Sequence, residues 1–462
     1  MSFSYRFLLW SGCTVPRLTG GGRAVVLRQV FTDLFGSVQA VSGYSLLTGL
    51  GLLLGFIREL TVASTFGLSS ELDVFVAVMS VQLFFGAQIG NALETAFISR
   101  IAKQGGAAVV GRSLLPALYG LALVNVGVVV FLLASAGLLL GAIFPQFNVA
   151  QQTLGIRTLH VLLVPIVCAS TAGLLRGALA ILGSFAPGFL AGSIVSLCTI
   201  LSIVFLSSLL GIDALTLGVA AGNLCVLVLF AVRLICLSQP RNWTRSTGLN
   251  TGWFVLWGAA GTVLIGEFAY SGVALTERSL ASWLPSGSIA GFFYASTIVS
   301  VPLSLLFIPL TTTTFPRMVE AFGRDPNAGL GLLRKQGMLL LVASVAAVVI
   351  VALFAQPIVE VVFMRGHFSS EHARFTASIL SITVFALPFM SLGRLLRNAC
   401  YSLADYRTPV AGLGVQWAML AGLGFMLVPR YGAQGLAVAM VAGEAATMLT
   451  MGVFFAARVR SM

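Results

Sequence analysis

The sequence predicts an all-α membrane protein with about twelve transmembrane helices in two six-helix lobes. Three observations lead to this fold class: a very apolar composition, apolar stretches of membrane-spanning length along most of the chain, and an internal repeat. The 462 residues are 58% hydrophobic and only 9% charged, and their mean hydropathy is +1.01. A water-facing surface of this size needs far more polar residues, so a soluble fold is excluded.

The individual helices are predicted from apolar runs, because a helix needs about 20 mainly apolar residues to cross a bilayer. Breaks at Gly, Pro or charged residues separate the runs and leave no room for a large soluble domain. In chain order, the predicted spans are 40–66, 73–100, 113–143, 155–181, 186–210, 214–237, 252–283, 287–315, 336–362, 372–403, 408–428 and 433–457.

Basic residues indicate the orientation, because Lys and Arg accumulate in cytoplasmic loops. The net charge of +12 resides mostly in short loops between apolar runs, a pattern typical of membrane topology and not of nucleic-acid binding. If the N-terminus is cytoplasmic, the side opposite the cytoplasm holds only four loop arginines: Arg157, Arg365, Arg374 and Arg430. The sequence therefore predicts that both termini are cytoplasmic.

An internal repeat predicts that the two lobes are copies of one unit. At an offset of 218 residues Glu59 matches Glu277, and at an offset of 221 Arg176 matches Arg397. Six crossings return the chain to its starting side, so both copies share one orientation. Chance similarity between Ala- and Leu-rich helices is the alternative. The predicted parts are a basic cytoplasmic tail (1–38), an N-terminal lobe (39–238), a cytoplasmic linker (239–251) and a C-terminal lobe (252–462).

Several ionisable residues fall inside the predicted spans, where each costs about 2.5 to 3.5 kcal/mol unless it finds a partner or water. Arg58–Glu59 and Glu277–Arg278 are sequence neighbours, whose side chains point about 100° apart on a helix. We therefore expect each to seek partners on other helices or in water, around a shared central cavity. There they would bind an anion or couple protons, or else form a structural set of salt bridges.

Four further charges have two interpretations each. Glu267 and Glu444 lie deep in the seventh and twelfth spans, where they either carry a coupling proton or hold helices together by hydrogen bonds. Arg394 and Arg397 are three residues apart and share one helix face near the cytoplasmic end of the tenth span. They either bind a lipid phosphate or extend toward the headgroups.

The sequence contains no motif for ATP hydrolysis or metal catalysis. Its only two lysines, Lys103 and Lys335, do not follow a GxxxxG run, so it has no P-loop. The segment 365–372 contains His367 and His372 but no further metal ligands, and we expect a solvated loop there. These observations predict a transporter without catalytic residues, cofactor or metal, driven by H⁺, Na⁺, the membrane potential or downhill lipid flow.

Five short motifs occur in the order found in one known family. They are GFIRE (55–59), LDVF (72–75), ERSLAS (277–282) with PSGSI (285–289), FMRGHF (363–368) and YSLADYRTP (401–409). Together they resemble the opening helices, the hairpin between helices seven and eight, the RGxF loop and the YALxDxRTP turn of the MurJ/MviN lipid II flippases. The likeness extends from about residue 44 to 460.

The resemblance implies a two-lobed fold of the multidrug/oligosaccharidyl-lipid/polysaccharide (MOP) exporter superfamily in the bacterial cytoplasmic (inner) membrane. It also implies alternating access for an undecaprenyl-diphosphate-linked glycan, performed by a monomer that works with polysaccharide or cell-wall synthesis machinery. The candidate substrate contacts are Arg58, Arg278, Arg394 and Arg397. The candidate coupling or gating residues are Glu59, Asp73, Glu267, Glu277 and Glu444.

The chain also departs from the family pattern. Leu52 stands where an arginine is usual, the paired arginines of the second helix are replaced around Phe85 and Gly86, and Thr297 replaces a basic residue of the eighth helix. The two last helices of lipid II flippases are also missing. We therefore predict a flippase for another lipid-linked oligosaccharide, as in exopolysaccharide or cell-wall assembly. The alternatives are lipid II itself, a multidrug antiporter of the same fold, or a membrane enzyme, for which no catalytic motif is found.

Overall fold

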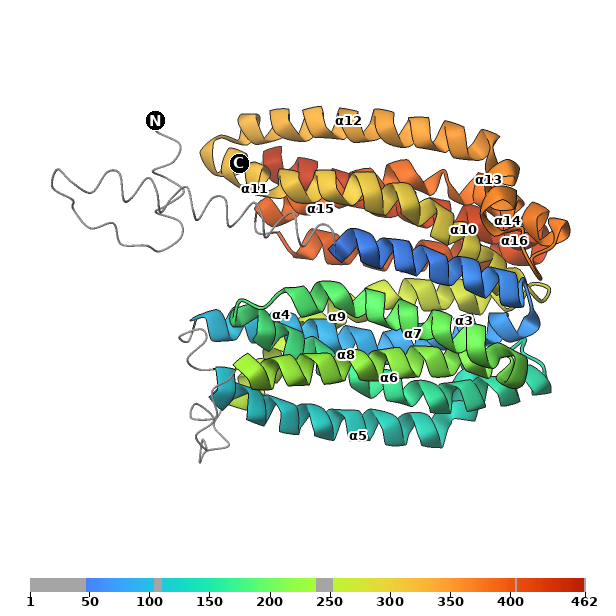
Figure 1. Cartoon of the computed structure of the whole chain (residues 1–462). Helices are drawn as coiled ribbons and strands as arrows, with labels where there is room; N and C mark the ends of the chain where they lie inside the picture. Colours follow the sequence, from blue (N-terminus) through green and yellow to red (C-terminus); the bar gives the residue numbers. More distant parts are fainter. Residues whose placement is uncertain (1–46, 104–109, 238–251, 404, 461–462) are drawn as a thin grey trace, which may run out of the picture.

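The computed structural model describes residues 47–103, 110–237, 252–403 and 405–460, and within them the regular secondary structure is helical throughout (Figure 1). The helices form two groups, the N-terminal and the C-terminal half of the chain, which lie mostly below and above each other in Figure 1, although the helix 47–66 borders the upper helices and α9 borders the lower ones. The predicted tail (1–38) and linker (239–251) lie outside the described residues. The all-α membrane fold predicted from composition is confirmed.

The first group contains the helix Leu47–Phe66 and the elements as far as α8. These elements are α3 (Ser70–Gln82), the π-helical turn η1 (Leu83–Ala87), α4 (Gln88–Lys103), α5 (Val110–Ile143), α6 (Val149–Ile181), α7 (Ala186–Leu210) and α8 (Asp213–Leu237). The second group comprises α9 (Gly252–Ala281), α10 (Ser288–Pro302), the π-helical turn η4 (Leu303–Phe307), α11 (Ile308–Arg324), α12 (Pro326–Leu353), α13 (Ala355–Phe363), α14 (Ser370–Thr383), α15 (Ala386–Ser402) and α16 (Arg407–Arg460).

Ten of the described helices are long and apolar enough to cross a bilayer, and α14 with α15 makes an eleventh span that is bent by 44°. Helix α16 contains 54 residues, which would extend about 80 Å if the helix were straight, far more than the roughly 30 Å of a hydrocarbon core. Its backbone leaves the helical conformation at Gly432 (φ 57°), between the predicted spans 408–428 and 433–457. The total of twelve spans stays a prediction that depends on counting α16 twice.

Side-chain caps define several helix starts. Ser69 accepts a hydrogen bond from the Leu72 amide at the start of α3, and Asn148 and Gln151 form a reciprocal capping box at α6. Asp405 accepts from the amides of Arg407 and Thr408 and from the Thr408 hydroxyl. Although partial burial opposes it, this set of hydrogen bonds lowers the pKa of the Asp405 carboxyl, which therefore stays charged.

The two halves carry the same backbone irregularity at equivalent positions. The π-helical turns 83–87 and 303–307 are 220 residues apart, close to the offsets of the sequence repeat. The second turn directly follows Pro302, which has no backbone N–H and therefore disturbs the helical hydrogen-bond pattern. Because a π-helical turn is rare, its recurrence supports a duplicated unit more strongly than matched residues alone.

Helix α9 and the helix Leu47–Phe66 lie along the seam between the groups (Figure 1). Helix α9 packs against both α4 of the first group and α16 of the second. The Gln88 amide donates a hydrogen bond to Ser271, and the rings of Phe84 and Phe268 stack with centroids 4.7 Å apart. A helix from the C-terminal half is thus bonded to the N-terminal half.

Within the N-terminal lobe, α4 and α6 cross at two glycines. A Cβ atom on Gly173 would lie 2.4 Å from the Gly90 carbonyl oxygen, closer than any real contact. Small residues let membrane helices approach until their backbones touch, and this contact replaces the hydrophobic driving force that a bilayer cannot supply.

We predict that Gly173→Ala destabilises the protein by about 1 to 3 kcal/mol, because the added methyl group meets backbone that cannot move aside. The measurement is the thermal melting temperature of the purified protein in detergent. The control is Gly127→Ala in α5, where a Cβ atom meets nothing within 4 Å. Equal melting temperatures for both variants would contradict the packing argument.

Candidate functional site

One end of the bundle is closed by a carboxylate that bridges the two lobes. Asp73 of α3 is 3% exposed, and its two oxygens accept hydrogen bonds from the amides of Gly287 (2.5 Å) and Ala290 (2.7 Å). These amides belong to the first turn of α10, so a side chain of the N-terminal lobe caps a helix of the C-terminal lobe. The negative charge also complements the positive end of the α10 dipole. By the distribution of basic residues, this is the periplasmic end.

A second backbone contact closes the same end. The His367 amide donates a 2.8 Å hydrogen bond to the Ser64 carbonyl at the end of the first helix. The neighbouring Gly366 has φ +58°, and a Cβ atom there would lie 2.2 Å from the Ser64 oxygen. Most residues of this loop are exposed, as predicted, but its backbone at Gly366 and His367 packs against Ser64 of the other lobe, which no residue spacing could indicate.

The hydrophobic cores differ between the two ends. In the periplasmic half, residues of both lobes share one cluster, which includes Leu72 and Phe144 as well as Tyr294 and Phe363. In the cytoplasmic half of the N-terminal lobe, the described cluster contains that lobe's own residues and only Leu256 and Ala260 from α9. The buried cores of the two lobes are thus joined toward the periplasm, whereas toward the cytoplasm the N-terminal core is joined to the C-terminal half through α9 alone.

A groove of about 720 Å³ lies along the first helix at the seam. The helix 47–66 contributes one wall, α10 with η4 contributes the second, and α12 and α13 contribute the third. Its walls are mainly apolar, with Leu52, Leu53 and Phe56 on one side, while Glu59 and Thr297 add polar atoms. Such a groove suits a chain-like apolar ligand that carries a polar end.

A smaller cavity of about 280 Å³ lies inside the C-terminal lobe. Helices α9, α10, α14, α15 and α16 line it, and it contains the carboxylates of Glu277 and Glu444 beside Arg278. Gln416 donates a 2.7 Å hydrogen bond to Glu444. Two carboxylates and one arginine give this cavity a formal charge of −1, which favours a small cation.

A band of polar side chains crosses the seam in the cytoplasmic half. Arg176 of α6 forms an ion pair with Glu94 of α4, with its Nε 2.7 Å from the carboxylate, and it also donates to Asn91. Asn91 in turn interacts with Glu267 of α9. The candidate coupling residue Glu267 therefore contacts the N-terminal lobe from a helix of the C-terminal half.

The expectation for the two adjacent charge pairs is wrong. Arg58 bonds to Glu59, and Arg278 lies 3.3 Å from Glu277, so each pair is closed within itself. The bonds from Cα to Cβ do diverge by about 100°, but an arginine side chain is long enough to fold back to its neighbour. The pairs also border different spaces: Glu59 lines the groove, and Glu277 with Arg278 lines the C-lobe cavity.

The remaining candidates on α15 behave differently. Within the described part of the chain, neither Arg394 nor Arg397 forms an ion pair, although Glu444 and Tyr401 lie within electrostatic range of Arg397. The described residues also contain no cluster of three or more His, Cys, Asp or Glu side chains that could hold a metal ion.

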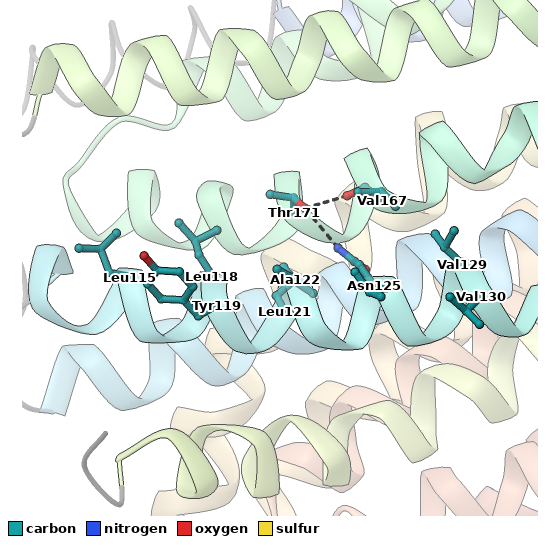
Figure 2. Close-up of a pocket in the computed structure, with 11 residues that line it drawn as sticks. Leu115, Leu118, Tyr119, Leu121, Ala122, Asn125, Val129, Val130, Val167 and Thr171 are labelled. Carbon is teal, nitrogen blue, oxygen red and sulfur yellow. Dashed lines mark hydrogen bonds between the residues drawn. The ribbon is translucent and has the colours of Figure 1, made fainter. Parts of the chain in front are cut away.

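A third cavity lies away from these residues, on the outer face of the N-terminal lobe. Figure 2 shows it between α5 and α6, with a volume of about 600 Å³ and almost entirely apolar walls. Its buried polar group, Asn125, is bonded to Ser170 and Thr171. None of the predicted site residues lines it, so it is a lipid-facing groove outside the candidate site.

Comparison with solved structures defines the class of protein. The chain resembles a structure described as "Lipid II flippase MurJ, inward closed conformation", with a TM-score of 0.77 and 18% identity over 90% of this chain and 87% of that one. It also resembles an inward-facing MATE-family multidrug transporter of the MOP superfamily, with a TM-score of 0.73 and 15% identity over 89% and 94% of the two chains. The chain therefore has the two-lobed fold that these two structures share.

Sequence comparison defines the family. The family model described as "Lipid II flippase MurJ" matches residues 62–461, so the chain belongs to the MurJ family. It is 27% identical to the probable lipid II flippase MurJ of Aquifex aeolicus over 88% of this chain and 81% of the relative. It is 25% identical to that of Bdellovibrio bacteriovorus over 86% and 77%. The resemblance stated from motifs is confirmed, as is a multi-pass location in the cytoplasmic membrane.

We predict that Asp73→Ala opens the periplasmic end, because two buried amides of α10 lose their acceptor, at about 1 to 3 kcal/mol each. The measurement is the labelling rate of Leu68→Cys, a buried junction residue, by a membrane-impermeant maleimide. We expect a rate about tenfold higher or more. Asp213→Ala is the control, because it breaks an ion pair with Arg157 inside the N-terminal lobe alone. Equal rates in the two variants would refute the bridging role.

Proposed function

We propose that this chain is a lipid II flippase, a transporter and not an enzyme, that moves its substrate across the cytoplasmic membrane by alternating access. This is the alternative of the sequence analysis, and it replaces the leading prediction of another lipid-linked oligosaccharide. The family match over residues 62–461 carries the proposal, and relatives covered over 81% and 77% of their length are named as probable lipid II flippases.

The groove at the seam supports a lipid substrate. A prenyl chain moves between bilayer and groove at little cost, since lipid tails are about as apolar as leucine. The charged and sugar-bearing headgroup is different, because it cannot cross hydrocarbon without polar partners. The groove borders the seam through Glu59 and Thr297, so the tail can stay in the bilayer while the headgroup passes between the lobes.

The closed periplasmic end supports the alternation. The cores of both lobes merge at the periplasmic end, whereas at the cytoplasmic end α9 alone joins them, so the headgroup would enter from the cytoplasm. Opening to the periplasm then requires release of Asp73 from α10 and of His367 from Ser64. In this proposal Asp73 acts as a gating residue, and the transporter works as a monomer with the cell-wall synthesis machinery.

The acidic cavity of the C-terminal lobe supports coupling to a cation, H⁺ or Na⁺. Glu444 and Glu277 would bind it, and Glu267 on the seam helix would transmit the change between lobes. The same cavity is the specific observation that favours the second candidate, a multidrug antiporter, since an acidic pocket attracts cationic drugs.

We predict that expression of this chain restores lipid II export in a bacterium depleted of its own flippase, as measured by periplasmic accessibility of lipid II. Leu53→Trp, which fills the groove, should reduce export about tenfold, as a loss of about 1.4 kcal/mol in binding does. Leu123→Trp on the lipid-facing side of α5 is the matched control. Drug resistance without lipid II export would instead support the antiporter.

We predict that Glu444→Gln removes cation coupling, because the amide keeps the shape and a hydrogen bond to Gln416 but loses the charge. The measurement is substrate transport in proteoliposomes with an imposed H⁺ or Na⁺ gradient, which should accelerate the wild type and leave the variant unchanged. The control is Glu360→Gln, a carboxylate bonded to Gln356 near the periplasmic end of α13. Equal acceleration of wild type and Glu444→Gln would exclude Glu444 from coupling.

A further inference from the structure

We propose that Arg394 and Arg397 of α15 bind the diphosphate of the lipid-linked substrate. This inference rests on the proposed function and adds the place at which the headgroup is held. The arguments are the ion-pair pattern, the repeat, and the surroundings of α15.

The ion-pair pattern separates these two arginines from the other candidates. Arg58, Arg278 and Arg176 each have a glutamate partner, so most of their positive charge is already compensated. Among the described residues, Arg394 and Arg397 have no such partner and donate no hydrogen bond that would compensate their charge. The Nε atom of Arg397 is moreover buried without an acceptor. A buried donor of this kind calls for a ligand, because native structures rarely leave one unsatisfied.

The repeat explains how the C-terminal lobe acquired two uncompensated charges. Arg397 is the counterpart of Arg176 at the offset of 221 residues. At the offset of 220, which the two π-helical turns define, the counterpart of Glu94 is Thr314. The carboxylate that neutralises the arginine in one lobe is therefore absent from the same place in the other.

The second of the two arginines, Arg394, lies at a position that is used for helix packing in the N-terminal lobe. At the offset of 221, Arg394 is the counterpart of Gly173, where α6 touches Gly90 of α4. The N-terminal lobe thus presents one compensated arginine, and the C-terminal lobe presents two uncompensated arginines one turn apart on the same face. If these arginines had only a structural role, a carboxylate partner would be expected in both lobes. A site for an anion requires that this partner be absent.

The surroundings of α15 fit a phosphate ester of a lipid. Tyr270 of α9 lies within electrostatic range of Arg394, and Tyr401 and Glu444 lie within electrostatic range of Arg397. At 1.5 Å per residue, the two arginines lie about 12 and 8 Å from the cytoplasmic end of α15 at Ser402. A diphosphate carries at least two negative charges, and two guanidinium groups can each bind phosphate oxygens bidentately.

The test measures binding of three probes to the purified full-length protein in detergent: farnesyl diphosphate, farnesol and inorganic diphosphate. Farnesyl diphosphate should bind most tightly, because it supplies both the tail and the anion. In R394Q/R397Q its affinity should fall about tenfold or more, while that of farnesol stays within about twofold. Inorganic diphosphate should show the same loss from a weaker starting affinity, which separates the anion site from the groove.

The matched control is R176Q, which removes the same charge from the repeat-related position, where Glu94 already compensates it. Its affinity for farnesyl diphosphate should stay within about twofold of the wild type. Wild-type affinity in R394Q/R397Q, or an equal loss in R176Q, overturns the proposal. Unchanged farnesol binding shows that each variant is folded, and R394K/R397K should restore part of the affinity if positive charge is what matters.

The site and the proposed function can fail separately. Binding that depends on Arg394 and Arg397 in a protein that does not export lipid II would retain the diphosphate site and refute the function. Restored export in the depleted strain, together with normal diphosphate binding by R394Q/R397Q, would retain the function and refute the site.

Discussion

The structure depends on the rule that a polar or charged group inside a bilayer must find its partner within the protein, since hydrocarbon offers none. Asp73 follows this rule by binding two amides of the opposite lobe, and this bond joins the lobes at the periplasmic end. Arg176 and Glu94 follow it inside one lobe. Each polar pair therefore also shows which helices are held together, and helices without such a pair can separate.

The most informative positions are those at which a charged group lacks such a partner. Two copies of one six-helix unit would be expected to compensate their charges in the same way, and the shared π-helical turns indicate how closely the copies still agree. They differ at Arg397, whose buried Nε has no acceptor, and at Arg394, which replaces a packing glycine. This asymmetry leaves the C-terminal lobe with positive charge that an anionic ligand would neutralise.

Several elements could be predicted closely from the sequence. The span predicted at 186–210 coincides with α7, and that at 214–237 differs from α8 by one residue, because continuous apolar runs with glycine breaks leave little freedom in the boundaries. The family motifs could also be recognised from the sequence. The ion pairs within Arg58–Glu59 and Glu277–Arg278 could not be predicted, because the length and rotamer of a side chain, and not the direction of its backbone, decide which charges meet.

The sequence by itself determined the class of protein and its all-helical membrane fold, and it predicted the topology and the duplicated unit, since each follows from local hydropathy, loop charge or matched residues. Only the tertiary structure decided which charges remain uncompensated and which end of the bundle is closed. The Asp73 bridge spans more than 200 residues of chain, and the packing of His367 against Ser64 spans about 300. Such contacts arise where two lobes happen to meet, and residue spacing along one helix carries no information about that meeting.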